Sequence, residues 1–440
     1  MIRKSLRLLG NLRLREIWQL RRTLCLFALS CLLCGTGIIS GCSTTPKNDF
    51  SSQAKGLVTQ GKYTDLIALC EKELKAKPND SELVAYRGVA QLRSGKADLA
   101  KADLLKAIAL DDKCGWYHRE LGNVYSDQGK YKDAVASYDN SLRLDSSAHN
   151  ASGTFTGRAY ANLCLSEPAK AVADASEAIK LDPGQSYNYC TRAEAFAELR
   201  ELDKGFLDAN KAIELDGKYP GSYLARAILY LAKGDCERSY ADALKVLSLN
   251  QKYWRASEYL LAIDLIKGDS GSAIKVADQL IAQFPDAALG YADKATCYFC
   301  INDLEQAGTL ADKALSLQPE SQRAFQTLEL VAARSGDAKK AFALLDRAEK
   351  ISPGGAGVAK DRVIALLFLK KYQEAVALCD ATMAKEVAEN KQYKSATTYR
   401  LRSEAYRRLK LNELADGDMN KALAQGYQKR SLLEQFLKQL

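Results

Sequence analysis

A pattern that repeats every 34 residues constrains this 440-residue chain more than any other feature. It is clearest over residues 115–148, where two short apolar patterns at helical spacing are separated by a turn that contains Gly129. The pattern predicts a pair of antiparallel helices. Because one such pair is too small to bury its own apolar faces, it must stack on copies of itself.

Copies of this unit fill most of the chain, with three extra residues before residue 152 and six before residue 396. Position 20 of the repeat is small in every unit except the first, which has Leu66, and a small residue lets two helices approach closely. The eleven predicted units begin at residues 47, 81, 115, 152, 186, 220, 254, 288, 322, 356 and 396. The small residues are Ala100, Ala134, Ala171, Gly205, Ser239, Ala273, Ala307, Ala341, Ala375 and Ala415.

Prolines and glycines also keep fixed positions in the repeat. Prolines at position 32 would end the second helix, and glycines at position 15 suit a turn that needs positive φ. The prolines are Pro78, Pro183, Pro285, Pro319 and Pro353, and the glycines are Gly61, Gly95, Gly129, Gly234, Gly268 and Gly336. A run of unrelated amphipathic helices would not place these residues in register, so a repeat array is favoured.

The period and pattern resemble the tetratricopeptide repeat, with its signature W-x2-L-G-x2-Y, then A-x3-F, then P. Leu121-Gly122, Tyr125, Ala134 and Tyr138 carry the resemblance in one unit, and it extends over about nine tenths of the chain. The resemblance implies an all-α fold, a right-handed α-solenoid of about eleven helix-turn-helix repeats over residues 47–429. Such an array is a single elongated unit with no central core.

Residues 430–440 predict one more helix. Ser431 and Glu434 fit a capping box. An apolar stripe is formed by Leu432, Leu433, Phe436, Leu437 and Leu440. We expect a helix that caps the exposed end of the array, and the alternative is a docking helix for a partner.

The N-terminus reads as a targeting segment. Residues 1–22 carry seven basic side chains and one acidic side chain, and an uncharged apolar run over residues 23–39 precedes Ser40-Gly41-Cys42. This arrangement resembles the lipobox of bacterial lipoproteins. The resemblance implies a signal peptide over residues 1–41, a diacylglycerol on the Cys42 thiol, a short linker over residues 42–46, and a protein anchored to the outer or plasma membrane that faces the periplasm or the exterior. Two alternatives stay open, an uncleaved signal anchor and a cytoplasmic array.

The net charge belongs mainly to this targeting segment. Without residues 1–41 the formal charge falls from +9 to +3, because seven basic residues and one acidic residue are removed. The rest of the chain therefore lacks the basic excess that is typical of nucleic-acid binding.

The residues that could carry chemistry do not form a recognisable site. His118 and His149 have no metal-ligand spacing around them, and Cys297-x2-Cys300 has no second pair. Cys70 and Cys379 occupy position 24, where sister units have Ala, which indicates buried thiols. We predict no catalysis, no cofactor and no metal.

The tetratricopeptide resemblance also implies a binding surface, since the first helices of such arrays line a concave groove with repeat positions 2, 5, 6, 9, 12 and 13. We call these the inner positions. They hold our candidate partner-binding residues Tyr86, Trp116, Arg119, Asn123, Tyr160, Tyr187, Tyr259, Phe299 and Arg400. Aromatic side chains of this kind can anchor an extended or helical peptide.

Two features qualify this surface. Arg119 and Asn123 match the first pair of a clamp that holds a peptide's C-terminal carboxylate in some tetratricopeptide domains, but Gly157, Tyr187 and Thr191 replace the other members, so we do not predict that ligand. A basic end formed by Arg400, Arg407 and Arg408 suits an acidic partner or lipid headgroups, or is a solvated helix face.

The function that these features favour is a membrane-anchored, non-catalytic scaffold that binds protein or peptide partners in its groove and serves assembly or maintenance of the cell envelope. The alternative is an envelope enzyme, or a carbohydrate-binding or export component, that uses the same groove.

Overall fold

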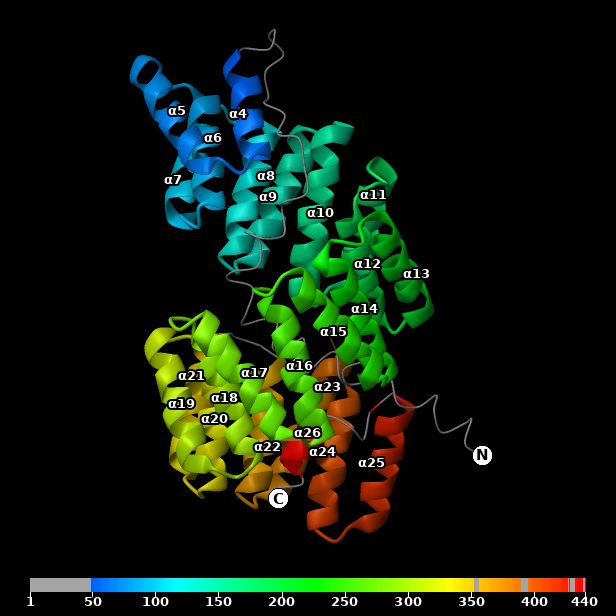
Figure 1. The fold of residues 1–440 in the computed structure, drawn as a ribbon. Coiled ribbons are helices and arrows are strands. Elements are labelled where there is room, and N and C mark those ends of the chain that lie inside the picture. Colours follow the sequence, from blue (N-terminus) through cyan, green and yellow to red (C-terminus); the bar gives the residue numbers. More distant parts are fainter. Residues whose placement is uncertain (1–48, 352–355, 389–394, 426, 428–431, 438–439) are drawn as a thin grey trace. The chain divides into compact units, whose positions relative to one another are not determined.

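The computed structural model describes residues 49–351, 356–388, 395–425, 427, 432–437 and 440, and within these ranges the regular structure is α-helical, without β-strands (Figure 1). The predicted signal peptide, Cys42 and the linker lie outside the described residues. The helices divide into two compact units, with the boundary after Ala225, inside α14 (Pro220–Lys233). We call residues 49–225 the N-terminal unit and the described residues from 226 onward the C-terminal unit.

The helices follow one another without other regular elements between them. The N-terminal unit contains α4 (Asp49–Thr59), α5 (Tyr63–Ala76), α6 (Ser81–Arg93), α7 (Ala97–Leu110), α8 (Gly115–Asp127), α9 (Tyr131–Leu144), α10 (Ala148–Cys164), α11 (Pro168–Leu181), α12 (Ser186–Leu199) and α13 (Leu202–Leu215). The C-terminal unit contains α15 (Cys236–Leu249), α16 (Trp254–Lys267), α17 (Ser270–Gln283), α18 (Ala288–Cys300), α19 (Leu304–Leu317), α20 (Gln322–Arg334), α21 (Ala338–Ile351), α22 (Ala356–Phe368), α23 (Tyr372–Ala388), α24 (Ser395–Arg408), α25 (Asn412–Ala424) and α26 (Leu432–Leu437).

Successive helices form pairs, from α4 with α5 to α24 with α25, so the predicted all-α helix-turn-helix fold is confirmed. One departure from the repeat is α10, which begins at Ala148. The three extra residues before residue 152 extend this helix to 17 residues, compared with 14 in α12. The insertion therefore lengthens a helix and does not form a loop.

The turn within each pair explains the glycine register. The six glycines at position 15 have positive φ, from +68° at Gly61 to +87° at Gly234, as we predicted. Five other pairs adopt the same conformation without glycine, at Ser166, Arg200, Asn302, Lys370 and Lys410. A side chain in this region costs about 1 kcal/mol or more, so the turn geometry overrides the local preference in these units.

The small residues at position 20 are buried, as predicted, and the alanines there are fully inaccessible to solvent. The described prolines at position 32 each lie two residues beyond the end of a second helix, for example Pro78 after α5. Apolar burial is distributed along the chain. One cluster spans residues 54–124, another spans residues 131–164, and the C-terminal unit has its own series.

A recurrent ion pair links the two helices of several repeats. An arginine at repeat position 7, on the first helix, donates two hydrogen bonds to an aspartate at repeat position 23, on the second helix, 16 residues later. The pairs are Arg87 with Asp103, Arg158 with Asp174, Arg192 with Asp208, Arg226 with Asp242, and Arg402 with Asp418. Because these bonds are bidentate and the aspartates are largely buried, they fix the geometry of a pair more firmly than exposed ion pairs do.

Candidate functional site

Inner positions of successive first helices lie against one another in both units. In the N-terminal unit the ring of Tyr86 on α6 lies 5.0 Å from that of Trp116 on α8. In the C-terminal unit the hydroxyls of Thr296 on α18 and Thr327 on α20 are 3.2 Å apart. In each unit, therefore, inner positions of neighbouring repeats contact one another.

The aromatic residues at these positions are more deeply buried than we expected of peptide anchors. Tyr86 is 0% exposed, Trp116 is 1% exposed, and both belong to the apolar cluster of residues 54–124. Phe50 packs edge-on against Tyr86 at 5.7 Å. Burial also raises the pKa of Tyr86 well above its ordinary value. In this conformation these two side chains stabilise the array and are not open to a ligand.

The remaining predicted aromatics differ in exposure. Tyr160 is buried, with its ring 6.5 Å from that of Tyr131, and Tyr259 is buried as well. Tyr187 is half-buried on α12, which makes it the most accessible candidate of the N-terminal unit. Phe299 is 1% exposed and belongs to the C-terminal apolar cluster.

Arg119 and Asn123 converge on a residue that the sequence analysis missed, Glu120. The Glu120 carboxylate accepts hydrogen bonds from Arg119 Nη2 at 2.8 Å, Asn123 Nδ2 at 2.9 Å and Trp116 Nε1 at 3.1 Å. All four side chains are buried. A carboxylate of the chain itself thus takes the place that the incomplete clamp would offer to a peptide carboxylate.

The charge of Glu120 is stabilised by this arrangement. Burial alone would raise the pKa of its carboxyl group, but the guanidinium groups of Arg119 and Arg93 and the hydrogen bonds from Arg119 and Asn123 bring the pKa below its ordinary value. Arg119 also donates to Asn150 Oδ1 on α10 at 3.4 Å. The network is therefore closed within the N-terminal unit.

Tyr138 explains why the clamp position on α10 is glycine. Its hydroxyl donates to Asn123 Oδ1 at 2.8 Å, and its ring lies between Gly122 and Gly157. A Cβ atom at either glycine would approach the ring to 2.6 Å, which is closer than real side chains come. A clamp asparagine in place of Gly157 would collide with Tyr138.

The C-terminal unit contains an arginine at the same repeat position as Arg119. Arg400 on α24 is buried, and it donates from Nε to Glu434 Oε1 at 2.7 Å and from Nη2 to Glu434 Oε2 at 3.2 Å. Its Nη1 donates to Glu404 at 3.0 Å, and the Tyr427 hydroxyl also donates to Glu434. Burial opposes the charged guanidinium, but its hydrogen bonds to Glu434 and the nearby acidic groups keep the pKa of Arg400 above its ordinary value.

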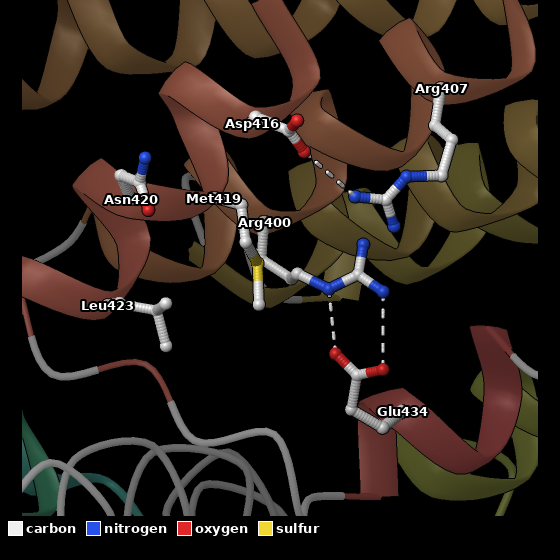
Figure 2. Close-up of a pocket in the computed structure, with 7 residues that line it drawn as sticks. All are labelled: Arg400, Arg407, Asp416, Met419, Asn420, Leu423 and Glu434. Atoms are coloured by element: carbon white, nitrogen blue, oxygen red, sulfur yellow. Dashed lines mark hydrogen bonds and ion pairs between the residues drawn. The ribbon is translucent and has the colours of Figure 1, made fainter. Parts of the chain in front are cut away.

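These groups border a pocket of about 670 Å³ between α24, α25 and α26 (Figure 2). Its lining is Arg400, Arg407, Asp416, Met419, Asn420, Leu423 and Glu434. The basic end that we predicted is therefore interleaved with carboxylates. Arg407 lies 3.7 Å from Asp416, and Arg408 donates to Glu404 at 3.1 Å. This mixed charge reduces its attraction for an acidic surface.

The predicted terminal helix is present as α26, but its contacts reach beyond the last helical pair. Leu433, Phe436 and Leu437 are buried in the C-terminal apolar cluster. The Phe436 ring packs edge-on against Phe299 of α18 at 5.4 Å, and α26 also contacts α16. Phe299, a predicted partner-binding residue, therefore touches a segment of its own chain.

Other charged inner positions were also missed. Arg323 on α20 forms buried ion pairs with Asp293 on α18 and, at 3.1 Å, with Glu258 on α16. Asp361 on α22 accepts from Gln326 at 2.7 Å, and burial raises its pKa to about 6. The signal was available, because these residues occupy repeat positions 2, 5 and 6.

The cysteines have the environment that their repeat positions predicted. Cys70 and Cys379 are fully buried, and burial raises the pKa of each thiol to about 12. Burial likewise raises the pKa of Cys300 to about 12. Such thiols are weak nucleophiles and weak metal ligands. Among the described residues no three His, Cys, Asp or Glu side chains are grouped as a metal site would require.

Comparison with known proteins agrees with the repeat architecture. A family model described as tetratricopeptide repeat matches residues 119–186. This match spans α9, α10 and α11 and includes Arg119, Glu120 and Asn123, and the same paired helices with a positive-φ residue in the turn continue on both sides of it. Residues 119–186 are thus similar to the tetratricopeptide repeat in sequence, and the described chain as a whole has the helix-turn-helix fold of such repeats.

Individual relatives are distant or partial. The FK506-binding protein-like protein of Rattus norvegicus is 42% identical over 65 residues, which are 15% of this chain and 18% of that protein. A tetratricopeptide repeat protein from Parabacteroides merdae is 19% identical with a TM-score of 0.46, and the match covers 57% of this chain and 98% of that one. Yeast Tom70 is 14% identical with a TM-score of 0.49, and the match covers 84% of this chain and 89% of that one.

The tetratricopeptide-repeat fold implies interaction with other proteins or peptides in general. Within the part of the chain that the structure describes, no helix has the length and apolar character needed to cross a membrane. The inner positions remain the surface to which the fold directs attention.

Proposed function

We propose that this tetratricopeptide-repeat protein is a non-catalytic scaffold that binds protein or peptide partners along the inner positions of its first helices. The observation that carries this proposal is a row of inner positions, charged and apolar, in which side chains of neighbouring repeats contact one another. Half-buried Tyr187 and the pocket beside Arg400 are accessible parts of this row. A row of this kind suits a peptide that lies across several repeats.

We further propose that the scaffold is held at a membrane of the cell envelope by a lipid on Cys42. The support is the sequence order of a basic segment, an apolar run and Ser40-Gly41-Cys42. Two or three acyl chains on one N-terminus anchor a protein nearly irreversibly, whereas a single chain binds only marginally.

Affinity capture tests the binding proposal. The tagged full chain is compared with Tyr187→Ala, and thermal melting confirms that the variant is folded. We expect Tyr187→Ala to lose or weaken specific partners of the wild-type chain. A set of partners that is unchanged by this variant, and by variants at other accessible inner positions, would move attention to the opposite helix faces.

Fractionation tests the anchor separately. Wild-type chain is expected with the membranes, and Cys42→Ala is expected to lose lipid labelling together with cleavage after residue 41. An uncleaved signal anchor would instead leave both forms at the same size and unlabelled, and protease accessibility in intact cells would report which side the array faces.

A further inference from the structure

The helix α26 contacts the C-terminal unit in the manner of a bound peptide. Its apolar side chains Leu433, Phe436 and Leu437 lie at spacing i, i+3 and i+4 and are buried, so one face of the helix is inserted. Phe436 meets the inner-position ring of Phe299 at 5.4 Å, and Phe299 in turn meets Phe368 of α22 at 5.9 Å. An amphipathic helix that places its apolar face on a helical surface is a recurring mode of peptide recognition.

A charged contact fixes the position of α26 on this surface. The Arg400 guanidinium grips the Glu434 carboxylate with two hydrogen bonds, and the buried Tyr427 hydroxyl donates to the same carboxylate. Tyr427 is held by a bond from its backbone amide to Ala422 O at 2.8 Å, so it belongs to the receiving side. The site thus offers two donors for a carboxylate beside an apolar surface for an aromatic ring.

The described part of α26 is short. It is six residues long, and an isolated helix of this length is not stable in water, so its helical form depends on the surface that it contacts. Only residues 428–431 separate it from Tyr427. A segment on so short a tether has an effective concentration in the millimolar range, which excludes free peptides of comparable intrinsic affinity.

We propose that Arg400, Tyr427, Phe299 and the apolar surface around them form a peptide-binding site, and that α26 occupies this site until a partner displaces it. The partner is a protein segment with the same chemistry as α26. It forms an amphipathic helix in which a leucine directly precedes an acidic residue, an aromatic residue follows two positions after that acidic residue, and a second leucine directly follows the aromatic residue. This inference rests on the proposed scaffold function and specifies one site, one class of partner and one means of regulation.

The test uses a fluorescent synthetic peptide with the sequence of residues 429–440 of this chain and anisotropy as the readout. The proteins are the full wild-type chain and a full-chain variant that carries Glu434→Lys and Phe436→Ala, which places a cation opposite Arg400 and removes the ring. We expect the variant to bind the peptide and the wild type to bind it at least about tenfold more weakly, because its site is occupied.

Specificity is tested with two matched changes. A peptide that carries Glu434→Gln is expected to bind the released variant about tenfold more weakly, which is the loss of one charge-assisted interaction. Adding Arg400→Ala to the released variant is expected to remove the difference between the two peptides. If the released double variant does not fold, as judged by circular dichroism, full chain with Phe436→Ala alone serves in its place.

The inference is overturned if a folded released variant does not bind the peptide, or if wild type and variant bind it equally. It is also overturned if both peptides bind the released variant alike. These results leave the scaffold proposal standing when wild type still captures partners that depend on Tyr187. Loss of the scaffold proposal alone would show as peptide binding by the released variant without any partner captured through inner positions.

Discussion

Arg119 in the N-terminal unit and Arg400 in the C-terminal unit occupy the same position of the repeat, yet their carboxylate partners come from different places. Arg119 is held by Glu120, its immediate neighbour on the same helix. Arg400 is held by Glu404 on its own helix and, with two hydrogen bonds, by Glu434, 34 residues later on a separate short helix. Both arginines are buried, and both are neutralised.

The difference shows that one repeat architecture can form two kinds of surface. In one kind the buried arginine is paired within its own helix, and in the other it is paired with a separate segment. A buried arginine requires a carboxylate, because leaving its charge alone in a low-dielectric site is costly. The carboxylate of Glu120 is adjacent to Arg119 on the same helix, so no movement of a separate segment can remove it. Where a tethered segment supplies it, the same requirement creates a site that another molecule can take over.

The strongest way to break this comparison is to remove each carboxylate. Glu120→Ala leaves Arg119 buried without its partner, and we expect the N-terminal unit to lose about 3 kcal/mol of unfolding free energy. Glu434→Ala should cost the C-terminal unit about 1 kcal/mol, because Arg400 keeps Glu404. Hydrogen exchange with mass spectrometry resolves the two units, and equal losses would contradict the distinction.

The pH dependence of Glu120 has a defined sign. Its native pKa lies below the ordinary value, so its contribution is fully present above the ordinary glutamate pKa of about 4.3 and is lost as pH falls through the native pKa. Wild type and Glu120→Ala should therefore converge in stability at strongly acidic pH. A difference that stays constant down to pH values near 2 would mean that the carboxylate charge is not what matters.

A second experiment concerns the packing that closes the N-terminal network. Gly157→Ala places a Cβ against the Tyr138 ring and should cost about 2 kcal/mol. Gly153→Ala on the same helix is the matched control, since its nearest neighbour would be Arg119 at 3.6 Å, an ordinary contact. Thermal melting of both variants separates steric closure from a general effect of alanine on α10.

The C-terminal unit should respond to pH in the opposite direction. Burial raises the native pKa of Asp361 to about 6, so the native state binds this proton more tightly than the unfolded chain, and stability falls as pH rises from about 4 to about 6. Asp361→Asn should therefore melt about 2 °C higher than wild type at pH 7, with no difference near pH 4. A lower melting temperature at pH 7 would contradict this assignment.

The smallest expected effect compares turns. Lys370 has a φ of +59°, so Lys370→Gly should stabilise the C-terminal unit by about 0.5–1 kcal/mol, while Gly336→Ala should destabilise it by about 1 kcal/mol. Denaturant unfolding measures both. A destabilised Lys370→Gly would show that contacts of the lysine outweigh its backbone strain.

The fold could be predicted from the sequence because local residues, the glycines and prolines, mark where its helices turn and end. Gly61 and its equivalents turn where positive φ is required, and Pro78 and its equivalents follow helix ends, so periodicity alone places the helical pairs. The arginine–aspartate pairs had a comparable signal, since Arg192 and Asp208 recur at fixed repeat positions, but it was not used.

The solvent exposure of the inner positions could not be predicted in the same way. Whether Arg119 meets solvent depends on the rotamer of Glu120, and the space beside Gly157 depends on a tyrosine from the preceding repeat. The position of α26 depends on a contact between Phe299 and Phe436, which are far apart in sequence. Periodicity identifies which positions face inward, but it does not say what already fills them.

The insertion in α10 has a consequence for assembly of the array. Asn150, one of the three extra residues, donates to Asp145 O at 2.9 Å and Ser141 Oγ at 3.0 Å and reaches Arg119. Repeat arrays are prone to pairing a unit with the wrong neighbour while they fold, because their interfaces are alike. A longer helix with its own asparagine distinguishes the junction between α9 and α10 from junctions made by 14-residue helices, and so favours a single order of stacking.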